Sequence, residues 1–215
     1  MNRSTRKPRS AWQNLLIAVA AMLALVSGYY LGNMASGKKP EFKTATVLPK
    51  PKALNDFNLT DKNGQPMSLE TLKGKWNLVF FGYTYCPDIC PTALTSMAEV
   101  YKALPDDSRA QAQTLFISVD PKRDTIDHLK KYVEFFNPSF LAATGEDAEL
   151  RALTKQVGIQ YKLHEADQSG NYLVDHGAWL IIINPDGEFH GVISGSHYPN
   201  PQGMASDIAT IIDIY

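Results

Sequence analysis

The chain has 215 residues, of which 44% are hydrophobic and 20% charged, and its formal net charge is -1. The charges are divided unevenly: residues 1–40 carry six Lys or Arg and no acid, which leaves 15 basic and 22 acidic residues in residues 41–215. A nucleic-acid-binding domain presents a basic face to phosphates, so the acidic main part argues against that class. We expect no nucleic acid among the partners.

A single membrane-spanning helix is predicted at residues 12–31. These residues are mostly apolar, and no charged residue occurs between Ser10 and Gly37. Twenty helical residues cover roughly 30 Å, which is the thickness of the bilayer core. The basic residues within 1–11 place the N-terminus in the cytoplasm. We therefore expect a single-pass protein of a bacterial inner membrane, with its main domain in the periplasm.

A cleaved signal peptide is the alternative for this apolar segment. It is less favoured because Asn33 disturbs the small-residue pattern that would precede cleavage after Ala35. Residues 32–53 follow, and their Pro- and Lys-rich composition without a clear period predicts a linker. Residues 54–215 then form one domain, which is long enough to bury roughly 70% of its unfolded surface.

Within this domain the hydrophobic pattern alternates between strands and helices. Strands are predicted at 57–67 (a hairpin), 76–81, 114–119, 139–142, 159–163, 171–174, 179–184 and 188–193. Helices are predicted at 92–104, 125–136, 147–157 and 204–214. This order predicts an α/β fold. Because a thiol motif lies between the buried strand and the first of these helices, we expect a thioredoxin-like three-layer sandwich.

The chain has only two cysteines, Cys86 and Cys90, which form a C-x-x-x-C motif. The motif lies between the strand predicted at 76–81 and the helix predicted at 92–104. Backbone N–H groups at a helix N-terminus lower the pKa of nearby thiols and favour the thiolate. Thiolates four residues apart can face one side of a turn and bind one soft metal ion. A stabilising disulfide is the alternative, but closing so short a loop gains little entropy.

Three motifs in order resemble those of the Sco/SenC proteins. They are the run Gly82–Pro91, the run Ser118–Thr125, and the pair Asp175-His176 before an apolar strand. One departure is Tyr85, where that family commonly has a histidine that is not a metal ligand. The resemblance covers about residues 55–214 and implies a membrane-tethered, thioredoxin-fold copper protein that assists assembly of the copper centre in cytochrome oxidase.

The resemblance also implies the site and the partners. Copper, as Cu(I) or Cu(II), would be held by Cys86, Cys90 and His176. The partner would be the copper-binding subunit of cytochrome c oxidase, and another copper carrier is a second candidate. Taken alone, a histidine before a strand is more often solvated or hydrogen-bonded than a ligand. However, thioredoxin-fold reductases usually place a cis-proline there, and this chain has no proline between Pro138 and Pro185.

Two functions from different classes follow. The first is a copper-binding assembly factor, and the second is a thiol–disulfide reductase in which Cys86 and Cys90 are catalytic. A peroxidase is a weaker third, because the second cysteine fits its usual site poorly. Asp175 is a candidate to orient the His176 imidazole, and a surface position without that role is the equal alternative. Among the remaining residues we expect four surface histidines (His128, His164, His190, His197), three core side chains (Trp76, Met97, Trp179), and turn or cap roles for Asp120 and Asp124.

Overall fold

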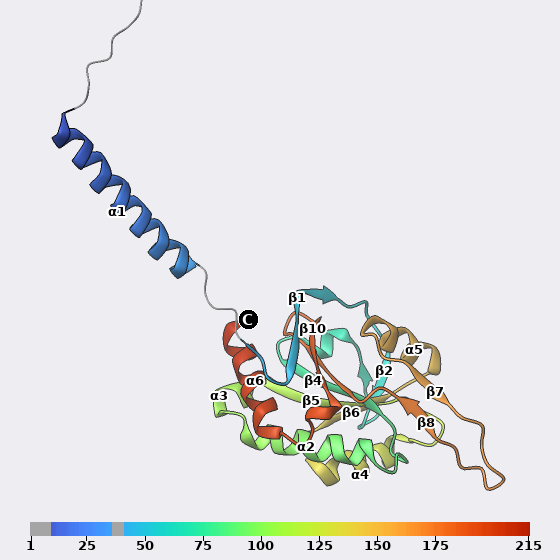
Figure 1. The fold of residues 1–215 in the computed structure, drawn as a ribbon. Helices are drawn as coiled ribbons and strands as arrows, with labels where there is room; N and C mark the ends of the chain where they lie inside the picture. Colours follow the sequence, from blue (N-terminus) through green and yellow to red (C-terminus); the bar gives the residue numbers. More distant parts are fainter. Residues whose placement is uncertain (1–9, 36–40) are drawn as a thin grey trace, which may run out of the picture. The chain divides into compact units, whose positions relative to one another are not determined.

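The computed structural model describes residues 10–35 and 41–215, which divide into two compact units between residues 41 and 42. In the first unit, α1 (Ala11–Ala35) contains one stretch, Ala11–Tyr30, that is long and apolar enough to cross a membrane (Figure 1). The described side chains of this stretch are exposed, and it overlaps the predicted span at 12–31. The basic segment 1–9 and residues 36–40 of the predicted linker lie outside the described residues.

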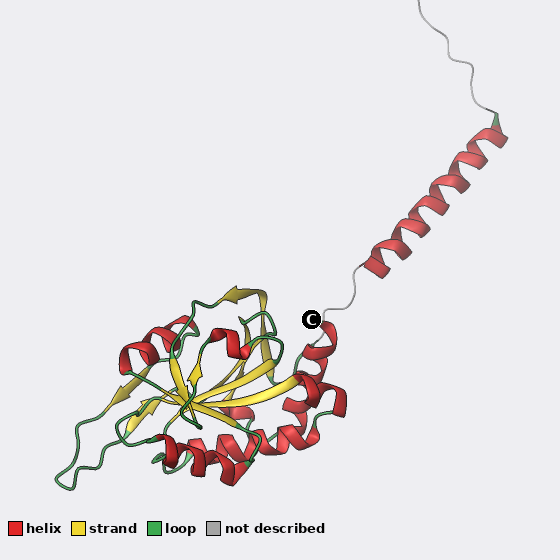
Figure 2. Cartoon of the chain, turned by 180° about the vertical axis from the view of Figure 1, so that it is seen from behind, coloured by secondary structure: helices red, strands yellow, loops and turns green. Residues whose placement is uncertain are grey.

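The second unit is built on an eight-stranded mixed sheet (Figure 2). From one edge to the other, the strands are β1 (Ala45–Ala53), β10 (Glu188–Ser194), β9 (Trp179–Ile183), β4 (Trp76–Gly82), β5 (Ala112–Ser118), β6 (Leu141–Thr144), β2 (Leu59–Asp61) and β3 (Pro66–Met67). The central strands β4, β5 and β6 are parallel, and the remaining pairs are antiparallel. All seven residues of β4 are buried, as its continuous apolar run predicts.

The helices complete the layers around this sheet. They are α2 (Ile89–Ala103), α3 (Asp106–Gln111), α4 (Ile126–Phe136), α5 (Asp147–Gln156) and α6 (Pro201–Ile214), with short 3-10 turns at Leu69–Leu72 and Gly195–His197. Figure 1 shows α2 beside α6 and α4, whereas α5 lies apart from them near β2 and β7. The apolar face of α2 buries Leu94 and Met97 completely. A mixed sheet with a helix that begins at Ile89, within the thiol motif, confirms the predicted thioredoxin-like fold.

The strand β1 lies where the sequence predicts a linker. It pairs antiparallel with β10, and its register shifts between Val47 and Lys52. Prolines are tolerated in edge strands and at irregularities, and this stretch contains Pro49 and Pro51, so its composition disguises a strand. Asp207 of α6 anchors the start of β1 by accepting hydrogen bonds from Thr44 and Ala45. The folded domain therefore begins before residue 54, and the predicted linker boundary is corrected.

A second, two-stranded sheet carries the Asp175-His176 pair. It consists of β7 (Tyr161–Leu163) and β8 (Val174–His176), with Tyr161 opposite His176. Both strands are predicted from the sequence, at 159–163 and 171–174, although the second begins three residues later than expected. The loop between the two strands projects from the domain (Figure 1). We call residues 161–176 the β7–β8 hairpin.

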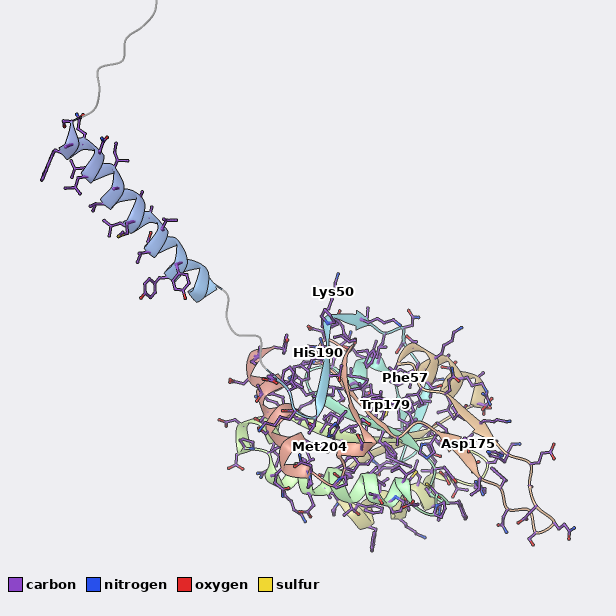
Figure 3. All side chains as sticks on the ribbon, in the orientation of Figure 1. Lys50, Phe57, Asp175, Trp179, His190 and Met204 are labelled. Atoms are coloured by element: carbon purple, nitrogen blue, oxygen red, sulfur yellow. The ribbon has the colours of Figure 1, made fainter. Side chains whose placement is uncertain are left out.

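Two predicted burial assignments are wrong (Figure 3). Trp179 begins β9 and is 44% exposed, because its ring lies at the open end of the strand beside Gly177. His190 is only 1% exposed, since it packs edge to face against Trp76 and Tyr215, with ring centres 5.0 Å and 4.7 Å away. The predicted exposure of His128 and His164 is confirmed, as is the burial of Trp76 and Met97.

Candidate metal centre

The two cysteines lie at the junction between β4 and α2. Cys86 occupies the connecting loop, and Cys90 occupies the first turn of the helix, which begins at Ile89. The backbone N–H of Cys90 points at the Cys86 sulfur, with 3.4 Å between N and Sγ. Cys86 is 8% exposed and Cys90 is fully buried, and neither forms a disulfide. The helix terminus therefore directs an N–H group at Cys86, as the sequence predicts.

Gly82, the last residue of β4, makes room for the Cys90 sulfur. A Cβ atom at this position would lie 2.7 Å from Cys90 Sγ and 3.0 Å from the Phe116 ring. Both distances are shorter than ordinary van der Waals contacts, so a side chain at residue 82 would displace the thiol. In the sequence, Gly82 is a glycine directly after the strand predicted at 76–81. Sequence reasoning missed that it makes room for the Cys90 sulfur, because Phe116, which closes the other side, belongs to the neighbouring strand β5.

Asp124 fixes the loop that leads to Cys86. Its buried carboxylate accepts hydrogen bonds from the Thr84 backbone N–H (2.9 Å), the Thr84 hydroxyl (2.6 Å) and the Ser118 hydroxyl. Burial raises the pKa of Asp124, and these hydrogen bonds oppose the shift. Asp124 has no cap role; the cap of α4 is Thr125, as the sequence also predicts, and its side chain accepts the His128 N–H. Asp124 thus ties three separate segments together beside the cysteines.

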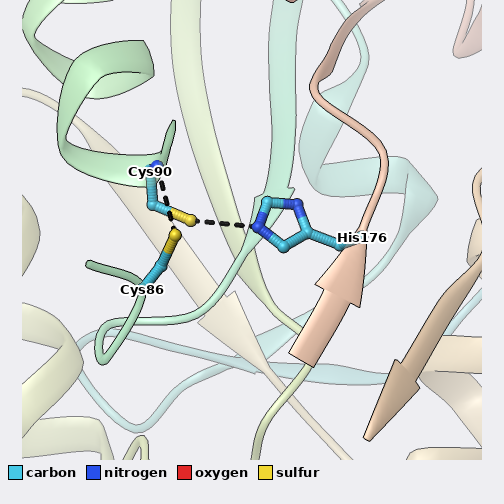
Figure 4. A group of neighbouring side chains, drawn as sticks. All are labelled: Cys86, Cys90 and His176. Atoms are coloured by element: carbon cyan, nitrogen blue, oxygen red, sulfur yellow. Dashed lines mark hydrogen bonds between the residues drawn. The ribbon is translucent and has the colours of Figure 1, made fainter. Parts of the chain in front are cut away.

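His176 reaches the cysteines from the end of β8 (Figure 4). Its Nε2 lies 3.3 Å from Cys90 Sγ, and its Nδ1 lies 3.3 Å from the Gly177 carbonyl oxygen. Tyr83 and Phe80 each pack edge to face with the imidazole, with ring centres 5.8 Å away. These contacts hold the ring with one nitrogen directed at a sulfur.

Of the two interpretations of Asp175, the structure supports a surface residue and contradicts the one in which it orients this imidazole. Asp175 Oδ2 lies 2.7 Å from His164 Nε2, and both side chains are exposed. Asp175 and His176 are adjacent residues of β8, and successive side chains of a strand point to opposite faces. Asp175 therefore points away from the side to which His176 turns, and the Gly177 carbonyl contacts the imidazole instead.

The ligand atoms of Cys86, Cys90 and His176 all lie within 4.8 Å of one another. Across residues 10–35 and 41–215, no other group of His, Cys, Asp or Glu comes together in this way. His128, for example, stacks on Tyr85 with ring centres 5.3 Å apart and does not join the group. Two sulfurs and one imidazole nitrogen are a donor set that suits copper or zinc.

The two thiols differ in their acidity. Hydrogen bonds from the Cys90 thiol, from His176 and from backbone N–H groups lower the pKa of Cys86, although burial opposes the shift. Burial, together with the hydrogen bond to the Cys86 sulfur, raises the pKa of Cys90. The environment therefore favours the thiolate at Cys86 and the thiol at Cys90. Binding of a metal ion by both sulfurs would release the proton of Cys90.

Comparisons with known proteins agree with this geometry. The SCO1/SenC family matches residues 46–213. The SCO2-like protein of Rickettsia conorii is 32% identical over 177 residues, covering 81% of this chain and 86% of that protein. Apo Sco1 of Thermus thermophilus has a TM-score of 0.72 at 32% identity, over 81% of this chain and 99% of that one. Copper-bound ScoI of Bradyrhizobium japonicum has a TM-score of 0.66 at 34% identity, over 74% and 98%. The chain belongs to the SCO1/SenC family.

Proposed function

We propose that this protein is a membrane-tethered copper-binding assembly factor that delivers copper to the copper centre of cytochrome c oxidase. Cys86, Cys90 and His176 would be the ligands. The observation that carries the proposal is the convergence of these three ligand atoms within 4.8 Å, on two separate elements of the fold. The copper-bound relative of Bradyrhizobium japonicum supports copper as the ion.

Delivery requires that copper can leave the site. A three-ligand site leaves coordination positions open, so a thiolate or imidazole of an acceptor can bind before a ligand of the donor dissociates. His176 is half-buried and lies on the β7–β8 hairpin, outside the main sheet. It is therefore the ligand that can be exchanged with the least disturbance of the core. The acceptor would be the copper-binding subunit of the oxidase, and another copper carrier would be the donor.

The helix α1 supplies the anchor in this proposal. Its apolar length suits one crossing of a bacterial inner membrane, and the basic residues that precede it in the sequence suit the cytoplasmic side. The domain that starts near residue 42 would then lie in the periplasm.

One observation favours a second function, the reduction of disulfides in the oxidase copper site. A thiol with a lowered pKa at Cys86 beside a buried thiol with a raised pKa at Cys90 is the asymmetry that disulfide exchange uses. The Cys86 thiolate would attack a disulfide, and Cys90 would resolve the mixed disulfide. Thioredoxin-fold reductases usually place a cis-proline opposite their cysteines, however, and no cis peptide bond occurs among the described residues.

Metal affinity of the full chain in detergent distinguishes the two functions. The protein would be reduced anaerobically and titrated with Cu(I), Cu(II) and Zn(II), beside His176→Ala and the control His164→Ala. His164 is an exposed histidine of the same hairpin and makes no contact with the cysteines. One tightly held copper per chain, weakened by His176→Ala alone, supports the carrier. Binding indifferent to His176, together with rapid disulfide reduction, would leave the reductase.

A further inference from the structure

We infer that Arg123 is a positioning residue that clasps the β7–β8 hairpin to residues 83–90, which we call the cysteine loop, and so sets the place of His176. This inference rests on the proposed copper site, because it assigns Arg123 a part in presenting the third ligand. Arg123 lies in the turn between β5 and α4, and its side chain is 17% exposed. From there it contacts both elements that carry the ligands.

On the hairpin side, Arg123 is joined to Tyr172. Its Nη1 donates to the Tyr172 carbonyl oxygen at 2.8 Å, and its guanidinium carbon lies 3.6 Å from the centre of the Tyr172 ring. Asp120 closes this group, because its fully buried carboxylate accepts hydrogen bonds from Arg123 Nε and from the Tyr172 hydroxyl, the latter at 2.6 Å. Backbone and side chain of Tyr172 are therefore both held by one Arg–Asp pair.

On the cysteine side, the same guanidinium faces two tyrosines of the loop. Its carbon lies 4.9 Å from the Tyr85 ring centre and 5.6 Å from the Tyr83 ring centre, within the range of cation–π attraction. Tyr83 in turn packs against the His176 imidazole, and its carbonyl oxygen accepts the Cys86 N–H at 3.3 Å. A single residue, Tyr83, thus links Arg123 to both His176 and Cys86.

The hairpin needs such a clasp because it has little of its own to hold it. Its strands are three residues long, and an isolated two-stranded hairpin is marginally stable in water. If the hairpin leaves its place, His176 is lost from the site, and the apparent affinity falls in proportion to the fraction of molecules in which it is seated. Lysine cannot replace Arg123, since it lacks the planar fork that contacts Asp120, Tyr172 and the rings together.

The test uses the metal-free full chain in detergent and follows amide hydrogen exchange. Variants Arg123→Lys and Arg123→Met are compared with Lys122→Met, which removes the exposed neighbouring cation. We expect residues 161–176 to exchange about tenfold faster or more in both Arg123 variants, a shift of about 1.4 kcal/mol or more in local opening. Exchange in α2 and in the Lys122 variant should stay unchanged. Unchanged hairpin exchange, or equal acceleration throughout the domain, would overturn the inference.

A double-mutant cycle then connects the clasp to the ligand. Arg123→Lys should weaken copper binding by about ten- to a hundredfold in the wild-type background, the range found for residues that orient metal ligands. In the His176→Ala background it should have no further effect, because the residue that it positions is gone. Equal losses in both backgrounds would contradict positioning of His176. If wild-type binding ignores His176→Ala, the copper proposal fails, and the exchange experiment still decides the clasp.

Discussion

The cysteine loop and the β7–β8 hairpin supply the two halves of the site, and they are built in opposite ways. The cysteines follow a fully buried central strand and open a helix whose inner face lies in the core. The hairpin has two strands of three residues, which form a separate small sheet, and its connecting loop is exposed. Segments with few buried contacts open at lower free energy than the core does. The sulfurs therefore form the fixed half of the site, and the imidazole forms the half that can move.

The largest effect should come from the anchor of the fixed half. Asp124→Ala removes the acceptor of three hydrogen bonds and leaves the buried Thr84 and Ser118 donors without a partner. Unsatisfied buried donors cost about 1–3 kcal/mol each, so we expect a loss of about 3 kcal/mol or more in the free energy of unfolding. Denaturant unfolding measures this loss. The exposed Asp127→Ala, in the first turn of the helix that follows Asp124, is the control, and equal losses would refute the anchoring role.

A methyl group at the end of β4 should have the next largest effect. Gly82→Ala places a Cβ against Cys90 Sγ and Phe116, and overpacking of this kind costs about 1–3 kcal/mol. The contact with Cys90 can be removed separately. In the Cys90→Ala background, Gly82→Ala should therefore cost measurably less in denaturant unfolding. If the cost is the same in both backgrounds, the sulfur is not what requires glycine at this position.

Acid should lower the stability of the folded domain through His190, which is buried on β10. Burial lowers the pKa of His190 below its ordinary value of 6.5, so the folded state binds its proton less readily than the unfolded state does. Stability is then complete above about pH 6.5 and is lost as the pH falls further, by up to about 1.4 kcal/mol per pH unit. His190→Phe should flatten this dependence in unfolding experiments between pH 5 and 8, whereas the exposed His128→Gln should preserve it. A slope that persists in His190→Phe would assign it to other groups.

The smallest effect should come from the exposed pair on the hairpin. His164 and Asp175 are 2.7 Å apart, but their side chains are 45% and 71% exposed. Surface ion pairs contribute about 0–1 kcal/mol, so Asp175→Asn should change hairpin amide exchange by less than about fivefold. The Arg123 variants provide the contrast. A larger effect of Asp175→Asn than of Arg123→Lys would mean that the surface pair, and not the buried clasp, holds the hairpin.

The sequence predicts the two halves of the site unequally. Cys86 and Cys90 are neighbours in the chain beside an unmistakable buried strand, so local pattern sufficed for the fixed half and for the thioredoxin-like core. The resemblance to the Sco/SenC motifs was needed to single out His176. Only the tertiary structure brings it to 3.3 Å from Cys90.

Two of the failures, at β1 and at His190, share one physical cause, which is that the deciding partner lies far away in sequence. The prolines of β1 predict a linker, and the feature that indicates a strand lies in its partner, β10. A Cβ on Gly191 of β10 would lie 2.6 Å from the Thr46 carbonyl oxygen, so this glycine permits the close approach of β1. Likewise, His190 is buried by Trp76 and by the C-terminal Tyr215, neither of which is near it in the chain.

The most direct test of the central claim is X-ray absorption spectroscopy at the copper edge on the copper-loaded full chain, wild type beside His176→Ala. The claim is that both halves bind one ion. It predicts two sulfur ligands and one imidazole nitrogen at copper in the wild type, and loss of the imidazole signal with both sulfurs retained in His176→Ala. Sulfur ligands alone in the wild type, or an imidazole signal that survives the substitution, would contradict it.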